Sequence, residues 1–250
     1  MSDAIKHVLI LGGGSAGWLT AAVIAADHHA ATGTGLKVTL IESPDVATIG
    51  VGEGTWPTMR DTLRRIGVTE TDFIRECDAA FKQGSKFVRW SEDREDDAYY
   101  HPFVLPQGYL ETNLVAGWMQ HSDVPFGKLA CFQPHLCEAG KAPKQFSTPE
   151  YAAVANYAYH LDAGKLGVFL RNHCINKLGV RHVSDHMTAI NAHENGDIAS
   201  LQTRDHGAIT GDLFIDCSGT RSLLLGEHYG VGLVSQKHVL FNDRAIAVQV

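Results

Sequence analysis

Residues 7–18, which read HVLILGGGSAGW, decide the fold of this chain. A short apolar run leads directly into the pattern Gly-x-Gly-x-x-Gly, and a helix-like segment follows it. In this pattern Gly12 permits a tight turn, Gly14 lets the backbone approach a pyrophosphate, and Gly17 lets helix and strand pack closely. The first N–H groups of such a helix attract phosphate oxygens. The stretch therefore predicts the first strand, turn and helix of a dinucleotide-binding fold.

A second strand is predicted at residues 36–42 (LKVTLIE), and it ends in an acidic residue. The carboxylate of Glu42 can accept hydrogen bonds from a ribose 2′-OH at this position. The interval from Gly17 to Glu42 is somewhat long for this role, and a polar loop over residues 27–35 explains the excess. The alternative is an ordinary strand–turn–helix with a glutamate on its surface.

Composition and charge restrict the class of protein. A chain of 250 residues can bury a sizeable core in one domain or two. Its 44% hydrophobic and 20% charged residues are typical of a soluble globular protein. The net charge of −7 argues against a nucleic-acid surface and against an anionic membrane as partner. Because the sequence shows neither a long apolar run nor a secretion signal, we expect a cytoplasmic protein.

The five cysteines are scattered, and no two form a Cys-x-x-Cys pair. Reduced thiols in the cytoplasm fit this usage best. Cys131 and Cys137 could ligate a metal together with a histidine, but their spacing is not that of a zinc site. We therefore expect no metal.

Periodicity and turn residues predict the remaining elements. Residues 91–98 are an acidic loop, and the proline-rich remainder of residues 91–150 is predicted to be an irregular insertion that covers a pocket. The other predicted elements are helices over residues 58–82 (interrupted near Gly67) and 151–178, strands over residues 86–90, 181–190, 198–203 and 213–215, and a hairpin turn at Asn195 and Gly196.

A second dinucleotide signal lies at residues 211–219, which read GDLFIDCSG. A buried parallel strand is predicted to lead into Ser218 and Gly219, where the backbone can pass under a cofactor without a side chain in the way. A long flavin dinucleotide is held by two separate parts of such a chain. Together with the N-terminal pattern, this segment therefore favours FAD over NAD.

Several motifs in combination resemble one known family. They are GGGSAGW at residues 12–18, IGVGEGTWP at 49–57, FKQGSKFVRW at 81–90, YHLD at 159–162 and the segment 212–219. Through them the chain resembles, over essentially its whole length, the flavin-dependent halogenases of the tryptophan halogenase type. The resemblance implies an α/β fold, an FAD-binding Rossmann-like domain of the GR2 or hydroxylase type with an inserted substrate-side region. Residues 1–250 would form a single domain with residues 91–150 as the insertion, and the C-terminal part of the family fold would be absent.

The resemblance also implies a reaction. In that family a separate flavin reductase supplies FADH2, and the reduced flavin and O2 give a hydroperoxide that oxidises halide to hypohalous acid. The oxidant then crosses a tunnel to a lysine beside an electron-rich aromatic substrate such as tryptophan or indole. By the matching segment this residue is Lys82, which either forms a haloamine or hydrogen-bonds hypohalous acid. Lysine suits both roles because its pKa falls readily on desolvation. A solvated lysine at a helix end is the alternative.

Further site residues follow from the resemblance alone. His101 and Phe103 match positions that flank the aromatic substrate, with ordinary packing as the alternative. No metal is implied, the small aromatic substrate and the flavin reductase are the implied partners, and a homodimer is one option for assembly. The implied flavin contacts are Gly12, Gly14, Ser15, Ala16, Gly17, Glu42, Ser43, Ile49, Val51, Gly54 and Val183.

Two residues of the flavin loop depart from the family pattern, since Gly54 replaces an alanine and Trp56 replaces an isoleucine. Trp56 could reshape the pocket wall, which leaves the substrate open. The second catalytic residue of the family, a glutamate, and its halide site are expected beyond Val250. Two other functions also stay open: a single-component flavin hydroxylase that uses NAD(P)H, and a non-catalytic FAD-binding module.

Overall fold

The computed structural model describes residues 4–46, 53–242, 244 and 246. The N-terminal part is the predicted strand–helix–strand unit, made of β1 (His7–Leu11), α1 (Ser15–Asp27) and β2 (Lys37–Glu42). The two strands pair in parallel, with Val8 opposite Val38 and Leu11 opposite Ile41. This part of the prediction is confirmed.

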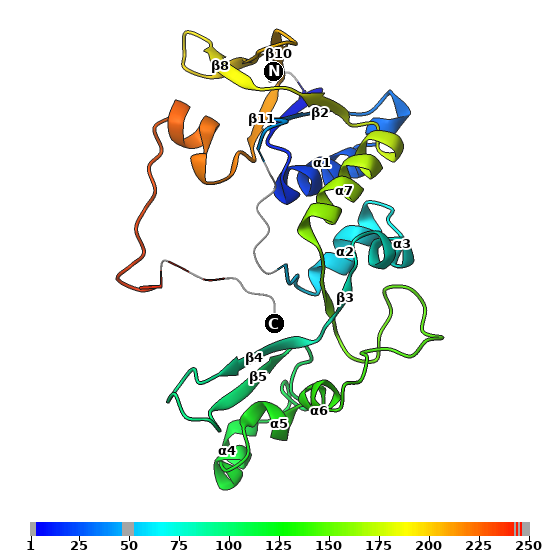
Figure 1. The fold of residues 1–250 in the computed structure, drawn as a ribbon, viewed down its shortest axis with the longest axis vertical. Coiled ribbons are helices and arrows are strands. Elements are labelled where there is room, and N and C mark those ends of the chain that lie inside the picture. Colours follow the sequence, from blue (N-terminus) through cyan, green and yellow to red (C-terminus); the bar gives the residue numbers. More distant parts are fainter. Residues whose placement is uncertain (1–3, 47–52, 243, 245, 247–250) are drawn as a thin grey trace.

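Two further strands complete a four-stranded parallel sheet of order β11-β1-β2-β7 (Figure 1). β11 (Leu213–Asp216) pairs with β1, and β7 (Arg181–Ser184) pairs with β2. The prediction of a parallel strand at residues 213–215 is therefore confirmed, although Leu213 is exposed and its neighbours are only half-buried. The α/β, Rossmann-type fold predicted from the sequence is confirmed.

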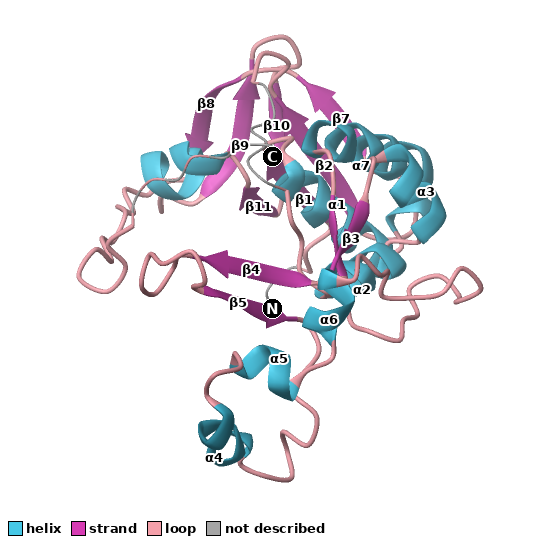
Figure 2. Cartoon of the chain, turned by 60° about the horizontal axis from the view of Figure 1, so that its bottom comes forward, coloured by secondary structure: helices cyan, strands magenta, loops and turns pink. Residues whose placement is uncertain are grey.

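The hydrophobic core lies on both faces of this sheet. Side chains alternate along a strand, so Val8 and Ile10 pack on one face with Trp18 of α1, in a cluster that also contains Leu170 of α7 (Ala163–Lys177). On the other face, Leu9 packs in a second cluster that also contains residues of a small antiparallel sheet. Figure 2 shows the helices and the antiparallel strands on opposite sides of the parallel sheet. Burial of both faces explains why the β1 sequence is continuously apolar.

The antiparallel sheet has the order β10-β9-β8. Its strands are β8 (Met187–Ala192), β9 (Ile198–Thr203) and β10 (Ala208–Thr210). The hairpin predicted at Asn195 and Gly196 joins β8 to β9, and Gly196 has a positive φ of 90°. The single strand predicted over residues 181–190 is wrong, because the chain leaves the parallel sheet after β7 and enters the antiparallel sheet at β8.

Below these sheets in Figure 1 lie two short helices and one strand pair, and a second strand pair belongs to the lower lobe beneath them. The predicted helix over residues 58–82 is confirmed only as far as Glu76, since its last residues form a strand. The predicted helix over residues 151–178 is also wrong at its start, where a strand precedes α7. Each of these two strands pairs with the other, which is a long-range contact that periodicity does not reveal. The elements are α2 (Thr58–Arg65), α3 (Glu70–Glu76), β3 (Ala80–Lys82), β4 (Gly84–Val88), β5 (Ala98–Pro102) and β6 (Ala158–His160).

Residues 91–150, in the lower lobe, contain more regular secondary structure than the sequence predicts. The antiparallel ribbon of β4 and β5 lies beside three short helices (Figure 2). These are α4 (Leu114–Trp118), α5 (Phe126–Ala130) and α6 (Gln133–Glu138). Single helical turns complete the described chain: η1 (Ala30–Thr32), η2 (Met119–His121), η3 (Gly219–Arg221) and η4 (Leu223–His228). In the described part of the chain, no helix has the length and apolar character needed to cross a membrane.

Candidate active site

The turn between β1 and α1 has the geometry of a phosphate cradle. Gly12 has a φ of 116°, and a Cβ at this residue would lie 2.1 Å from the carbonyl oxygen of Cys217. A Cβ at Gly17 would lie 1.9 Å from the carbonyl oxygen of Gly12, so both positions require glycine. A Cβ at Gly14 would meet nothing within 4 Å, which leaves this side of the turn open.

Ser15 and Ala16 are the first residues of α1 and directly follow Gly14, the N-cap of the helix. The helix has no side-chain cap and no acidic residue in its first turn. An anion can therefore bind at its first N–H groups.

Glu42 ends β2 beside the same turn. A Cβ at Gly13 would lie 2.3 Å from the Glu42 side chain, so the carboxylate reaches over the glycine turn. His182 of β7 places its Nε2 atom 2.9 Å from Oε2 of Glu42, although this contact is not aligned as a hydrogen bond and Nε2 has no such partner among the described residues. Burial lowers the pKa of His182, and the Glu42 carboxylate opposes that shift. The neighbouring Val183 is buried in the strand and lies opposite Ile41 of β2.

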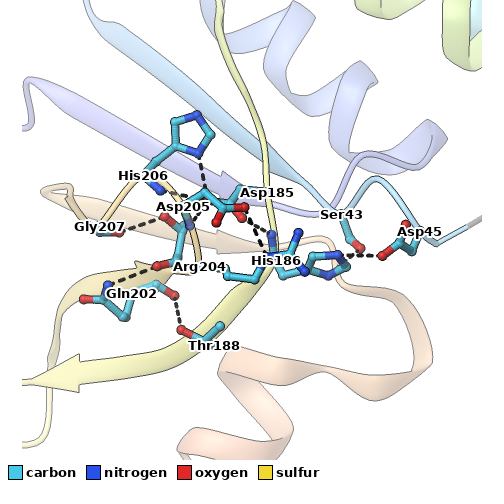
Figure 3. A network of polar contacts seen from close by, with 11 residues as sticks. Ser43, Asp45, Asp185, His186, Thr188, Gln202, Arg204, Asp205, His206 and Gly207 are labelled. Carbon is cyan, nitrogen blue, oxygen red and sulfur yellow. Dashed lines mark hydrogen bonds and ion pairs between the residues drawn. The ribbon is translucent and has the colours of Figure 1, made fainter.

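A polar network holds the chain where it leaves β2 (Figure 3). The His186 ring lies between Ser43 and Asp45, with Nδ1 3.1 Å from the Ser43 hydroxyl and Nε2 2.7 Å from the Asp45 carboxylate. The adjacent Asp185 is buried and accepts hydrogen bonds from the backbone and the ring of His206. Burial opposes ionisation of Asp185, but these hydrogen bonds outweigh it and hold its pKa well below the usual range. The network thus fixes the start of the flavin loop. Ile49 and Val51, farther along that loop, lie outside the described residues.

Lys82 is the last residue of β3 and lies in an aromatic environment. Its Nζ atom is 5.6 Å from the centre of the Trp56 ring and 5.7 Å from the centre of the Phe103 ring. No described residue forms a hydrogen bond or ion pair with this ammonium group. Burial lowers the pKa of Lys82. Within the described part of the chain, the Lys82 ammonium group therefore contacts aromatic rings and not a carboxylate.

Gly54 and His160 complete the surroundings of Lys82. A Cβ at Gly54 would lie 2.8 Å from Nζ of Lys82, so the lysine lies directly over this glycine. Gly54 forms a β-bridge with His160 of β6, and burial together with the charge of Lys82 lowers the pKa of His160. The sequence contains His160 in a family motif but gives no signal of this proximity, because the pairing of β3 with β6 is not local.

Trp56, His101 and Phe103 form one aromatic wall. The Trp56 and Phe103 rings have centroids 5.6 Å apart, and the Trp56 and His101 rings have centroids 6.2 Å apart. The backbone of Phe103 is fixed by a hydrogen bond of 2.8 Å from its N–H to Oε1 of the buried Gln133. Sequence reasoning includes His101 and Phe103 among the site residues, whereas Trp56 enters only as a departure from the family pattern.

A buried carboxylate supports the strand pair that carries Lys82. Glu70 of α3 is only 3% exposed and accepts hydrogen bonds from the hydroxyls of Tyr157 and Tyr159, from the Tyr151 N–H and from Lys144. Tyr159 lies opposite Phe81 in the pairing of β6 with β3. Burial opposes ionisation of Glu70, but these hydrogen bonds outweigh it and lower its pKa. The cluster thus ties α3 to the strand next to Lys82.

Comparison with known proteins identifies the family. The tryptophan halogenase family model matches residues 7–250. The chain belongs to the tryptophan halogenase family. It is 35% identical over 267 residues to tryptophan 7-halogenase RebH of Lentzea aerocolonigenes, in a match that covers 100% of this chain and 49% of that protein.

Solved structures agree with this assignment. The tryptophan halogenase of Shewanella frigidimarina is 50% identical and superposes with a TM-score of 0.90, covering 97% of this chain and 48% of that one. Tar14, a tryptophan C-6 flavin-dependent halogenase, is 32% identical with a TM-score of 0.83, covering 93% of this chain and 46% of that one. The chain thus spans about half the length of the relatives it matches. The family resemblance predicted from the motifs is confirmed.

Proposed function

We propose that this chain forms the flavin-binding and lysine-bearing part of an FADH2-dependent halogenase that acts on tryptophan, indole or a related electron-rich aromatic. The observation that carries the proposal is the placement of Lys82. Its nitrogen lies beside two aromatic rings that also contact each other, has no charged partner among the described residues, and belongs to a chain of the tryptophan halogenase family.

The residues of the glycine turn fit a flavin dinucleotide. The open face at Gly14 and the uncapped start of α1 suit the pyrophosphate, and Glu42 suits a ribose hydroxyl. Beside Gly54, the Oε1 atom of Glu53 is buried without a hydrogen-bond partner among the described residues, which is a free acceptor at the edge of the flavin loop. The residues we propose as FAD contacts are Gly12, Gly14, Ser15, Ala16, Gly17, Glu42, Ser43, Ile49, Val51, Gly54 and Val183. Reduced FAD, when bound, would reduce O2 to the peroxide level, and oxygen at that level would oxidise chloride or bromide to hypohalous acid.

Lys82 then delivers the halogen. In one route the neutral amine exchanges an N–H bond for an N–halogen bond, the halogen comes from hypohalous acid, and water is released. In the other route the ammonium group donates a hydrogen bond to hypohalous acid and polarises its oxygen–halogen bond. Either way the aromatic carbon gains the halogen and loses a proton. The lowered pKa of Lys82 enlarges the neutral fraction that the first route needs.

The surrounding side chains position this step. The Trp56 and Phe103 rings place apolar surface beside Lys82, where burial lowers its pKa. We propose His101 and Phe103 as part of the substrate-side wall, with residues 91–150 as an insertion of the single domain 1–250. A separate flavin reductase is the proposed partner, and a homodimer is the proposed assembly.

Product analysis tests the proposal. The intact enzyme is supplied with FAD, a flavin reductase, NADH and O2, and is given indole or tryptophan with either bromide or chloride. A product in which halogen replaces hydrogen, recognised by its isotope pattern in mass spectrometry, supports the proposal. A product that gains one oxygen instead supports a flavin hydroxylase. FAD binding without any product supports a flavin-binding module, and either result contradicts the proposal.

A further inference from the structure

Trp56 already covers the two other rings of the aromatic wall, His101 of β5 and Phe103 just after that strand. Trp56 contacts Phe103 at a centroid distance of 5.6 Å and His101 at 6.2 Å. Both values are those of rings in direct contact, which lie roughly 4.5–7 Å apart. A further ring placed between two others would need about twice that separation. No substrate ring therefore fits between Trp56 and either of its two neighbours.

The remainder of the Trp56 indole is open and lies next to the reactive nitrogen. Its side chain is 57% exposed, although it contacts two other rings. Nζ of Lys82 is 5.6 Å from the centre of the same ring. The described residues thus leave more than half of Trp56 accessible to a flat aromatic molecule, and the same ring contacts Lys82.

We infer that Trp56 is a substrate-contacting and specificity-determining residue, on which the aromatic ring to be halogenated stacks. This inference rests on the proposed function. Its chemical basis is that an indole offers a large, rigid, electron-rich surface, and an offset-stacked flat ring gains contact with that surface at little conformational cost. The expected ligand is a flat, electron-rich aromatic molecule. Stacking on Trp56 would set the distance between the ring of this molecule and Nζ of Lys82.

Binding measurements on the intact enzyme test the role of Trp56. Indole is titrated calorimetrically, without halide, into the wild type and into Trp56→Phe, Trp56→Ile and Trp90→Ile variants. Trp90 is the matched control because it is similarly exposed (64%) and packs on Phe87, outside the Lys82 surroundings. We expect Trp56→Ile to raise the Kd of indole at least about tenfold. Trp56→Phe keeps an aromatic face and is expected to raise it no more than about threefold. Trp90→Ile is expected to leave it unchanged.

The halogenated products give a second readout. Wherever wild-type product forms, we expect Trp56→Ile to alter the ratio of ring positions halogenated, with unchanged affinity for FAD. An unchanged indole Kd in Trp56→Ile, or an equal loss in Trp56→Phe and Trp56→Ile, would overturn the stacking role. The titration requires no turnover, so its result is independent of whether the enzyme halogenates. Wild-type enzyme that binds indole through Trp56 but yields no halogenated product would overturn the proposed function and with it the assignment of Trp56 to specificity.

Discussion

At the scale of single residues, Gly17 and Gly14 of the glycine-rich segment are glycines for different reasons. Gly17 is required by packing, because a Cβ there would overlap the carbonyl oxygen of Gly12. Gly14 has an ordinary φ of −72°, and a Cβ there would meet open space. The fold therefore requires glycine at position 17, whereas glycine at position 14 is explained by a ligand that approaches the backbone.

This difference separates folding from cofactor binding. We expect Gly14→Val to fold with little change in stability, within roughly 1 kcal/mol, and to weaken FAD binding at least about a hundredfold by blocking the pyrophosphate. Gly17→Ala is expected to lower the melting temperature strongly. Flavin fluorescence titration and thermal unfolding of the same samples check both expectations. Unaltered FAD affinity in Gly14→Val would refute the cradle.

The absence of a side chain at Gly54 leaves room for the end of the Lys82 side chain. A Cβ there would lie 2.8 Å from Nζ of Lys82, but Nζ is the end of a flexible side chain and can move. We therefore expect Gly54→Ala to leave the free energy of unfolding within about 0.5 kcal/mol of the wild type, to displace Nζ, and to lower kcat about threefold to tenfold. Gly117→Ala is the control, since a Cβ at Gly117 meets nothing within 4 Å. Equal kcat values in the two variants would show that Gly54 does not position the lysine.

At the scale of elements, the strand pair β3–β6 depends on a buried acid in a helix. Glu70 is ionised in the folded protein and its pKa is lowered, so its stabilising effect is present above the ordinary carboxyl pKa of 4.5. It is lost as the pH falls below that value toward the folded pKa.

Substitution of Glu70 tests this link between α3 and β6. Glu70→Ala would strand two tyrosine hydroxyls and the Lys144 ammonium, and we expect it to cost about 3 kcal/mol or more at pH 7. The difference from the wild type should shrink as the pH is lowered through 4.5. Urea unfolding at several pH values measures it. A loss that stays constant down to pH 3 would show that ionisation of Glu70 contributes nothing.

At the scale of the whole molecule, the sequence predicts elements formed by neighbouring residues but not contacts between segments that are far apart in the chain. The β1–α1–β2 unit is predicted correctly because its apolar runs and glycines follow one another within 36 residues. The turn at Gly196 and strand β9 are likewise local. The pairing of Lys82 with Ala158, by contrast, joins segments far apart in the chain. The buried Tyr157 and Tyr159, just before β6 and within it, lie in a stretch whose apolar pattern also suits a helix.

For the candidate site, the sequence likewise predicts several of the residues but not the contacts between them. The family resemblance includes Lys82, His101 and Phe103 among the site residues, but it does not reveal that Trp56 lies against all three. That contact depends on how β3, β5 and the loop before α2 meet in space. A substitution of isoleucine by tryptophan is visible in the sequence, whereas its effect on the aromatic wall requires the fold.

The most direct test of the central claim is the Lys82→Ala variant of the intact enzyme, assayed beside Lys86→Ala. Lys86 lies on the adjacent β4 and contacts the Tyr100 ring, so it is a nearby lysine outside the proposed site. We predict that Lys82→Ala binds FAD and consumes reduced flavin as the wild type does, while halogenated product falls at least about a hundredfold. Lys86→Ala should form product at the wild-type rate. Halogenated product formed at an undiminished rate by Lys82→Ala would contradict the account.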